Sequence, residues 1–376
     1  MPPRVLHVVE NLDRGAVEAW LLQLMCHARR RGVVLNWSFY CAVGAPGERD
    51  EQARELGAGI VPSPVPVGQK FAFARALREE VDRGSYEILH CHHDLVCGFY
   101  LAACLGLKLR KIVHIHNVGE SVLTPSRVKQ AILKPALRRT CLLLADRVAA
   151  NSRHSLDTFL AGRPWRPGRD NVHYLSVDPA PFIRARPDRA AFRRALGIAE
   201  AAPIMLFAGR MTPEKNPVFA VDVLAALRRR IPEVSGVFAG AGSLEHAVHS
   251  RAAELGQESA VHCLGWRHDV PDVMSVCDWF ILPSPESPME GFGIAVVEAQ
   301  LAGLRLLLSR GIADDPLLPT ACFRRLSLKD DPELWADAAI ELWTAPAPSR
   351  EAALDALRAS PMDMDTALQD MMRLHR

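Results

Sequence analysis

The sequence predicts an α/β protein made of two Rossmann-like domains, each with a mostly parallel β-sheet. Short apolar runs rich in β-branched residues alternate with helical patterns, as is typical of βαβ units. This alternation begins a second time after a proline-rich segment at residues 178–187. The chain has 376 residues, which is enough for two domains that each bury a core of their own.

The first series of elements lies in residues 1–178. We expect strands at 5–9, 35–42, 88–90 and 112–116, followed in turn by helices at 17–30, 50–56, 95–105 and 127–145. A helix between two strands returns the chain so that the second strand runs parallel to the first. These pairs therefore predict a parallel sheet in an N-terminal domain.

The second series follows an expected linker at residues 179–187 and forms a C-terminal domain at 188–361. We expect strands at 204–209, 234–239, 261–264, 279–282 and 305–308, with helices at 219–230, 244–255, 270–276 and 294–302. Beyond residue 308 the pattern indicates a loop. Residues 362–376 are typical of a helix that packs back across the domains.

The composition indicates a globular protein of the cytoplasm. Hydrophobic residues make up 49% and charged residues 23% of the chain, so disorder and a polytopic membrane protein are both excluded. The first apolar run is too short for a signal peptide. Nine cysteines without a CxxC pair indicate free thiols in a reducing compartment. A net charge of only +2 argues against nucleic acid as a partner.

Residues 108–139 form a basic patch, although the net charge of the whole chain is close to zero. The segment contains a single acidic residue, Glu120. Its basic residues are Lys108, Arg110, Lys111, Arg127, Lys129, Lys134, Arg138 and Arg139. Such a helix can lie on an anionic membrane surface, which would place the protein at the inner face of the plasma membrane. An ordinary helix with a solvated basic face is the alternative.

The strongest local motif runs from Pro283 to the end of the expected helix at 294–302. Gly291 and Gly293 permit close approach of a ligand to the backbone, and the free N–H groups of a helix that starts at Ile294 bind anions. Glu290 would lie in the loop beside that anion site, and Glu298 in the second helical turn could reach a hydroxylated ligand. For either glutamate alone, a solvated carboxylate is the alternative.

A second motif follows the first strand of the C-terminal domain. Gly209, Arg210 and Lys215 lie where α/β domains bind phosphates, and two cations there can neutralise a diphosphate without a metal ion. The spacing is not that of a P-loop. Two exposed cations on a loop are the alternative. The nearby Gly240 and Gly242 form a lone GxG, for which we expect a tight turn.

The N-terminal domain carries a turn at Gly15 and histidines at the ends of two strands. The turn could approach a phosphate or simply start a helix. The histidines at 90, 92, 93, 114 and 116 could be interpreted as zinc ligands, but they lack a fixed Cys/His framework, so we expect no metal. His116 is the one expected to make polar contacts or handle a proton, while His90 and His114 are expected to be structural.

Together these motifs resemble family 4 of the retaining glycosyltransferases with the GT-B fold, particularly bacterial exopolysaccharide and lipid-linked glycan enzymes. The resemblance covers nearly the whole chain. It rests on the two-glutamate motif Glu290-x7-Glu298, on Gly209-Arg210-x4-Lys215-Asn216, and on Asp146-x4-Asn151-Ser152. It implies two Rossmann-like domains facing across a cleft, the N-terminal one for the acceptor and the C-terminal one for a nucleotide sugar.

The resemblance also implies a role for individual residues. Arg210 and Lys215 would bind the donor diphosphate, and Glu298 the ribose hydroxyls. Glu290 would bind the donor sugar with the backbone around Phe292, Gly293 and Ile294. His116 would lie beside the reacting centre, and the turn at Gly15 and Ala16 would face the diphosphate. The expected catalytic set is therefore Glu290, His116, Arg210 and Lys215, with Gly209 in the donor loop.

The activity so implied is that of a retaining hexosyltransferase that needs no metal or other cofactor. It would move a sugar from a nucleoside-diphosphate sugar to a glycan or lipid-linked saccharide in cell-surface polysaccharide or glycolipid synthesis. Two alternatives are a nucleotide-sugar epimerase and an inactive nucleotide-binding subunit that regulates a partner transferase. The second is favoured only by Ala16, which replaces the second glycine of the family's first loop.

Overall fold

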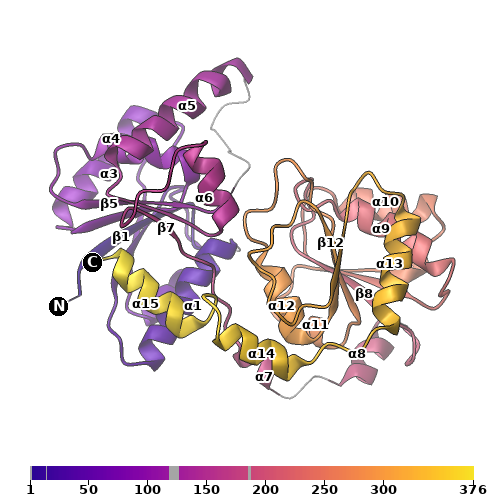
Figure 1. Cartoon of the computed structure of the whole chain (residues 1–376). Coiled ribbons are helices and arrows are strands. Elements are labelled where there is room, and N and C mark those ends of the chain that lie inside the picture. The colour runs from indigo at the N-terminus through magenta and orange to yellow at the C-terminus, as the bar shows by residue number, and fades with distance from the viewer. Residues whose placement is uncertain (1, 14, 118–126, 185–187) are drawn as a thin grey trace. The chain divides into compact units, whose positions relative to one another are not determined.

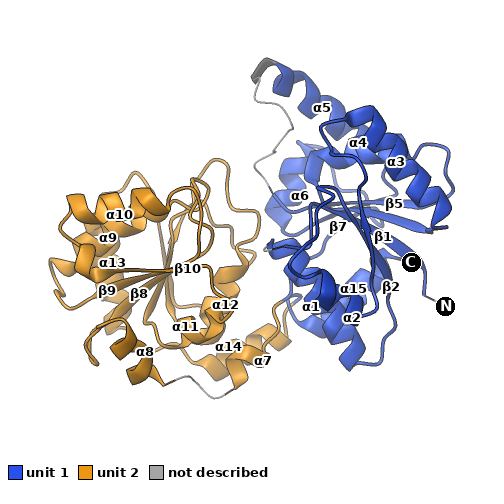
Figure 2. Ribbon diagram, turned by 180° about the vertical axis from the view of Figure 1, so that it is seen from behind, with its two compact units in different colours: residues 1–176, 361–376 blue, residues 177–360 orange. Residues whose placement is uncertain are grey.

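The computed structural model describes residues 2–13, 15–117, 127–184 and 188–376, without the side chains of residues 127 and 128. The chain forms two compact units (Figure 2). The first comprises residues 1–176 together with 361–376, and the second comprises residues 177–360. Both are α/β units with one parallel sheet, so the predicted fold class is confirmed.

The sheet of the first unit has seven parallel strands in the order β3-β2-β1-β4-β5-β6-β7. Their bounds are β1 Arg4–Val9, β2 Asn36–Cys41, β3 Gly59–Pro62, β4 Ile88–Cys91, β5 Arg110–Ile115, β6 Arg147–Ala150 and β7 Asp170–Val172. The predicted strands match β1, β2, β4 and β5, whereas β3, β6 and β7 had not been predicted. These three strands read GIVP, RVAA and DNV, so short length combines with small, polar or proline residues and leaves no clear apolar run.

Helices cover both faces of this sheet (Figure 1). On one face lie α3 Lys70–Arg83, α4 Cys97–Ala103 and α5 Arg127–Leu144, and on the other lie α1 Ala16–Arg30, α2 Asp50–Glu55 and α15 Met364–Leu374. The chain also forms α6 Arg153–Leu160 and the short 3-10 helix η1 Asp94–Val96. The C-terminal helix α15 belongs to the first unit and packs on α1.

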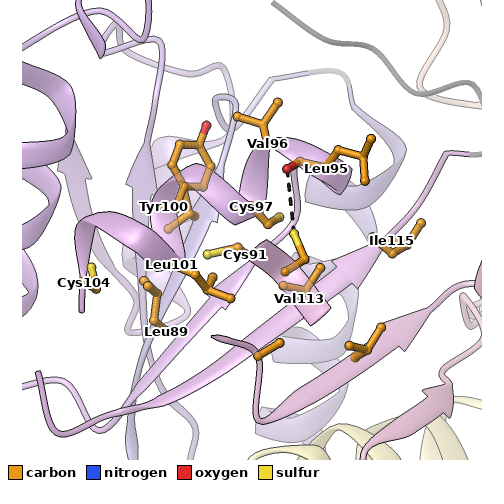
Figure 3. Packing of buried hydrophobic residues seen from close by; sticks show 14 of the residues in the cluster. Leu89, Cys91, Leu95, Val96, Cys97, Tyr100, Leu101, Cys104, Val113 and Ile115 are labelled. Carbon is orange, nitrogen blue, oxygen red and sulfur yellow. Dashed lines mark hydrogen bonds between the residues drawn. The ribbon is translucent and has the colours of Figure 1, made fainter. Parts of the chain in front are cut away.

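The core under α4 and α5 is closely packed (Figure 3). The aliphatic side chains of Leu89, Leu101 and Val113 are fully buried there, together with the thiol of Cys91. At Gly98 on α4, a Cβ atom would lie 2.5 Å from the backbone oxygen of Leu137 on α5, so glycine is what lets the two helices approach. The helix α5 continues through Pro135.

The second unit has a six-stranded parallel sheet in the order β10-β9-β8-β11-β12-β13. The strands are β8 Ile204–Ala208, β9 Ser235–Ala239, β10 Val261–Gly265, β11 Trp279–Leu282, β12 Arg305–Ser309 and β13 Phe323–Leu326. All but β13 had been predicted. This strand carries two arginines in four residues, which hides it from a search for apolar runs.

The helices of the second unit are α7 Ala180–Ile183, α8 Arg189–Ala195, α9 Pro217–Arg228, α10 Glu245–Glu254, α11 Val270–Ser275, α12 Ile294–Ala302, α13 Pro332–Thr344 and α14 Arg350–Arg358, with η2 Glu258–Ala260. The predicted bounds of α12 are those observed. The expected loop after residue 308 is present at residues 310–322, but β13, α13 and α14, which had not been predicted, follow it. Residues 185–187 of the expected linker lie outside the described residues, and α7 belongs to the second unit.

Two further expectations can be compared with the structure. All nine cysteines are free thiols, as predicted. No helix of the described chain has both the length and the apolar character needed to cross a membrane.

Candidate functional site

Each sheet has a point where the order of strands reverses, between β1 and β4 in the first unit and between β8 and β11 in the second. The loops that leave two such strands diverge to opposite faces, so the carboxyl edge of the sheet opens there and binds ligands in α/β proteins. All the predicted site residues lie in or directly after the loops at or beside these two points.

In the second unit, the loop from β8 to α9 carries Arg210 and Lys215. A turn places Lys215, because the backbone N–H groups of Lys215 and Asn216 both donate to the oxygen of Thr212, at 3.0 Å. Asn216 has φ +51° and precedes Pro217, the first residue of α9. Arg210 is exposed. The loop therefore holds one cation against the protein and presents the other to solvent.

The β9–α10 loop supports this cation loop from the side. The backbone N–H groups of Gly209 and Met211 donate to the oxygens of Ala239 and Ala241, at 3.0 and 2.9 Å. Gly240 has φ +149°, and a Cβ atom there would lie 1.9 Å from the oxygen of Gly209. The lone GxG is therefore a contact between two loops, and its glycines set the path of the backbone beside Arg210.

The β11–α12 loop brings Glu290 to the same place. Glu290 Oε2 lies 2.5 Å from Lys215 Nζ, and both side chains are about one-sixth exposed. The Ser284 hydroxyl donates to the same carboxylate oxygen at 3.3 Å, and the Glu290 N–H donates to the oxygen of Gly311 at 2.8 Å. The two loops that leave the reversal point are thus joined by a cation and an anion from the two strongest sequence motifs.

The start of α12 lies next to this ion pair. Gly293 is the N-cap with φ +77°, and a Cβ atom there would lie 3.3 Å from Glu290 Cγ. Phe292 is buried, and Ile294 opens the helix. Among the described residues, no side chain makes a capping hydrogen bond at this end of α12. Its first N–H groups therefore form a positive site beside Lys215 and Glu290.

Glu298, one turn further along α12, has a different environment. Its side chain is half-buried, and burial raises the pKa of its carboxyl to about 7. Within residues 188–376, no hydrogen bond or ion pair to this carboxylate is present. A half-buried carboxylate without such a partner is suited to accept a hydrogen bond from a ligand hydroxyl.

In the first unit, Gly15 is the N-cap of α1 and Ala16 its first residue, and both are exposed. The carboxylate of Glu18 folds back over this turn, because a Cβ atom on Gly15 would lie 1.8 Å from Glu18 Oε2. Burial raises the pKa of Glu18 to about 7. The backbone of this turn is therefore exposed to solvent, and the Glu18 carboxylate lies against one side of it.

His116 directly follows β5 and is buried. Its backbone is held at both ends, since its N–H donates to Asp94 Oδ1 at 2.7 Å and its carbonyl accepts from Asn151 Nδ2 at 2.7 Å. Its ring nitrogen Nε2 lies 3.0 Å from His92 Nδ1, and burial holds the pKa of His116 well below its usual value, so the imidazole is neutral.

Two family models match the chain. The model described as Glycosyltransferase Family 4 matches residues 17–181, and the model described as Glycosyl transferases group 1 matches residues 188–312. Together they span His116 in one unit and every predicted site residue of the other. The chain belongs to the family 4 glycosyltransferases.

Named relatives and solved structures agree with this membership. The chain is 29% identical to the glycosyltransferase EpsF of Bacillus subtilis over 93% of its length and 90% of that protein. It is 28% identical to a D-inositol 3-phosphate glycosyltransferase of Mycolicibacterium gilvum, covering 91% of this chain and 80% of the relative.

The structure of Anabaena HepE with UDP-glucose matches this glycosyltransferase at a TM-score of 0.78, with 20% identity and 98% of each chain covered. WaaG, a glycosyltransferase involved in lipopolysaccharide biosynthesis, matches at 0.75 with 16% identity, covering 98% of this chain and 99% of that one. These likenesses show that the glycosyltransferase has the GT-B fold.

Several residues that hold the site of the glycosyltransferase were not predicted from its sequence. Asp94 and His92 contact His116, but His92 was considered only as a possible zinc ligand and Asp94 was given no role; Asn151 was noted only as part of a motif. Gly240 was interpreted as a local turn, whereas it contacts the neighbouring loop. An Asp directly after β4 was the available signal, since β4 adjoins β5 in any sheet of this order.

Proposed function

We propose that this glycosyltransferase moves a sugar from a nucleoside-diphosphate sugar to a hydroxyl of a saccharide acceptor, with retention of the anomeric configuration and without a metal ion in the transfer step. The observation that carries the proposal is the pairing of Lys215 with Glu290 at the reversal point of the second sheet, beside the open N-terminus of α12.

The donor site follows from the charges in these loops. Arg210, Lys215 and the N-terminal N–H groups of α12 are cationic or partially positive groups at one sheet edge, which suits a diphosphate. Glu298 offers an unpaired carboxylate for ribose hydroxyls. A donor of this class is supported by HepE, whose structures were solved with UDP and UDP-glucose.

The proposed reaction breaks the bond between the anomeric carbon and the diphosphate oxygen. An acceptor hydroxyl forms the new bond on the same face of the sugar, and its proton passes to the departing phosphate oxygen. Negative charge therefore grows on the diphosphate, and fixed cations lower the barrier because they interact most strongly with that charge. Losing one such group raises a barrier by about 3–4 kcal/mol.

Glu290 and Lys215 would act together in this step. When Lys215 pairs with the bound diphosphate instead of Glu290, the Glu290 carboxylate can accept hydrogen bonds from the hydroxyls of the donor sugar. The ion pair thus keeps both groups in place before the donor binds, so little reorganisation is needed afterwards.

The proposed acceptor is a lipid-linked saccharide, with α5 resting on an anionic membrane surface. Lys129 and Arg139 are exposed on α5, as are the apolar Ile132 (69%) and Leu143 (70%). Residues 118–126 of the basic patch lie outside the described residues. In a flotation assay, the protein should float with anionic vesicles, and the double variant Arg138→Gln/Arg139→Gln should float less. The double variant Arg163→Gln/Arg166→Gln is the matched control. Equal flotation of the two double variants would contradict the proposed contact between α5 and the membrane.

The transfer itself is tested by release of nucleoside diphosphate from UDP-, GDP- and ADP-sugars with EDTA present. Release from one donor should be lost in Glu290→Gln and kept in Glu254→Gln, a change at an exposed glutamate elsewhere. The anomeric proton of the first-formed product, followed by NMR, gives the stereochemistry. Release that stops with EDTA refutes metal independence. Nucleotide binding without any release favours an inactive subunit.

A further inference from the structure

The first unit contains a cluster of buried histidines that the proposed transfer does not use in full. They come from β1, from the ends of β4, β5 and β7, and from the residue after α15. The members are His7, His90, His92, His114, His116, His173 and His375, and each is at most 5% exposed. His7 and His375 lie at opposite ends of the chain, so no local spacing in the sequence indicates that they meet.

Hydrogen bonds join these rings into two chains. In the first, His7 Nδ1 lies 3.0 Å from His92 Nε2, and His92 Nδ1 lies 3.0 Å from His116 Nε2. In the second, His375 Nε2 lies 3.0 Å from His90 Nδ1, and His90 Nε2 lies 3.3 Å from His114 Nδ1. Burial lowers the pKa of every ring in both chains, so the rings are neutral.

The first chain has a nitrogen at each end that lacks a partner. Neutral imidazoles carry one N–H each, so three rings joined by two hydrogen bonds leave one N–H over. The terminal atoms, His7 Nε2 and His116 Nδ1, are buried and form no hydrogen bond with the described residues. Burying an unpaired polar group is destabilising, because it loses its hydrogen bonds to water. His7 Nε2 is therefore a buried nitrogen that is available to bind a metal ion.

We propose that His7, His90 and His375 bind a divalent transition-metal ion of the Zn²⁺ class. One ring nitrogen of each lies within 4.8 Å of the other two. The ring centroids form a nearly equilateral triangle, with separations of 5.0, 5.2 and 5.6 Å. Ligation at the usual Zn–N distance of about 2.0–2.1 Å would require these rings to move inward.

The donor set selects the class of metal. Three neutral imidazoles suit Zn²⁺, Cu²⁺, Ni²⁺ or Co²⁺, whereas Mg²⁺ and Ca²⁺ require oxygen ligands. Metal-bound histidines usually donate their second N–H to a neighbouring acceptor, and two of these ligands have one. His7 can donate through Nδ1 to His92, and His90 through Nε2 to His114. The ion would replace only the bond between His90 and His375.

Binding would have two consequences for the fold. Ligation of His7 through Nε2 puts its proton on Nδ1, so that His92 must donate to His116 and leave His116 with an N–H on Nδ1. The ion would also fasten the end of α15 to β1 and β4. That helix is otherwise held through Asp365, which pairs with His27 and Arg31, and through the Ala367 oxygen, which accepts from His173 Nε2 at 3.0 Å.

The test is titration of the metal-free full chain with Co²⁺, whose visible absorption reports tetrahedral nitrogen ligation, and with Zn²⁺ followed by thermal unfolding. Wild type should bind one Co²⁺ with that absorption, and Zn²⁺ should raise its Tm. His375→Gln can still bond to His90 but ligates poorly, and it should bind at least tenfold more weakly, as should His7→Gln. His249→Gln, at an exposed histidine, should match wild type.

Three results would overturn the site: no tetrahedral absorption, equal affinity in wild type and His375→Gln, or a loss confined to His249→Gln. Circular dichroism shows whether each variant is folded. If His7→Gln does not fold, the affinity of His375→Gln alone tests the metal site. None of these measurements depends on sugar transfer, so the metal site and the proposed function are tested independently.

Discussion

Lys215 Nζ and Glu290 Oε2 lie 2.5 Å apart, although the two residues are separated by 75 positions in the chain. They come from the loops after β8 and β11, the strands between which the sheet order reverses. The contact joins the two motifs that the sequence analysis had assigned to different parts of one donor. It also means that each residue leaves the other's charge half-buried and unpaired when it is removed.

Replacing either member of this ion pair should harm turnover more than stability. Lys215→Met and Glu290→Gln should each lower the free energy of unfolding by about 1–2 kcal/mol, because one half-buried polar group loses its partner. Turnover should fall about 100- to 1,000-fold, the usual effect of removing a group that stabilises transition-state charge. Chemical denaturation and nucleoside diphosphate release measure the two effects. Removing the exposed pair of Arg358 and Asp355 should change neither.

Gly240→Ala, a change in the β9–α10 loop, should disturb the neighbouring β8–α9 loop that carries Arg210 and Lys215. Its Cβ atom would clash with the Gly209 oxygen, at 1.9 Å, and the residue has a positive φ. We expect a loss of more than about 2 kcal/mol in stability and a higher KM for the donor. Gly256→Ala is the control, since Gly256 also has a positive φ (+64°) but open space around it; it should cost about 1 kcal/mol and leave KM unchanged. Equal KM values for both variants would show that the loop contact has no role in donor binding.

Glu298→Gln should stabilise the protein and weaken nucleotide binding. Burial raises the pKa of Glu298 from 4.5 to about 7, so between these pH values the folded state binds more protons than the unfolded state. This group therefore makes stability fall as the pH rises from 4.5 to 7. At pH 8 the variant should be more stable by about 2–3 kcal/mol, and at pH 4 equal to wild type. Denaturation at both pH values measures the difference, and a gain that is equal at pH 4 and 8 would contradict the assignment.

Asn151→Ala should act on the protein through His116. It leaves the buried His116 carbonyl without its donor, which should cost about 1–3 kcal/mol and reduce turnover. Asn171→Ala removes a similar bond, from Asn171 Nδ2 to the Arg169 oxygen at 2.9 Å, on β7. Denaturation and donor turnover of the two variants separate the effects: only Asn151→Ala should lose activity beyond its loss of stability.

The fold was predictable where strands are apolar and helices begin with clear signals. The α12 helix was placed to the residue, because Gly293 and Gly303 bound it at both ends. The α13 helix was missed although Asp331 caps it and Pro332 occupies its first position, since the stretch before it contains no apolar strand to pair with. A search for caps independent of strands would have found it.

The candidate site was predictable as a set of motifs but not as a set of contacts. Lys215 and Glu290 were singled out separately, and only the strand order brings them together. The meeting of His7 with His375 depends on where α15 packs, which helix periodicity does not determine. Contacts between distant parts of the chain are what a single sequence leaves open.

The most direct test of the donor site is the affinity for nucleoside diphosphates, measured by calorimetric titration of UDP, GDP and ADP into wild type, Arg210→Ala and Arg358→Ala with EDTA present. We predict that one nucleotide binds wild type and Arg358→Ala alike, and Arg210→Ala at least tenfold more weakly, because Arg210 is the exposed cation of the β8–α9 loop. Unchanged affinity in Arg210→Ala, or no binding of any of the three nucleotides to wild type, would contradict the account.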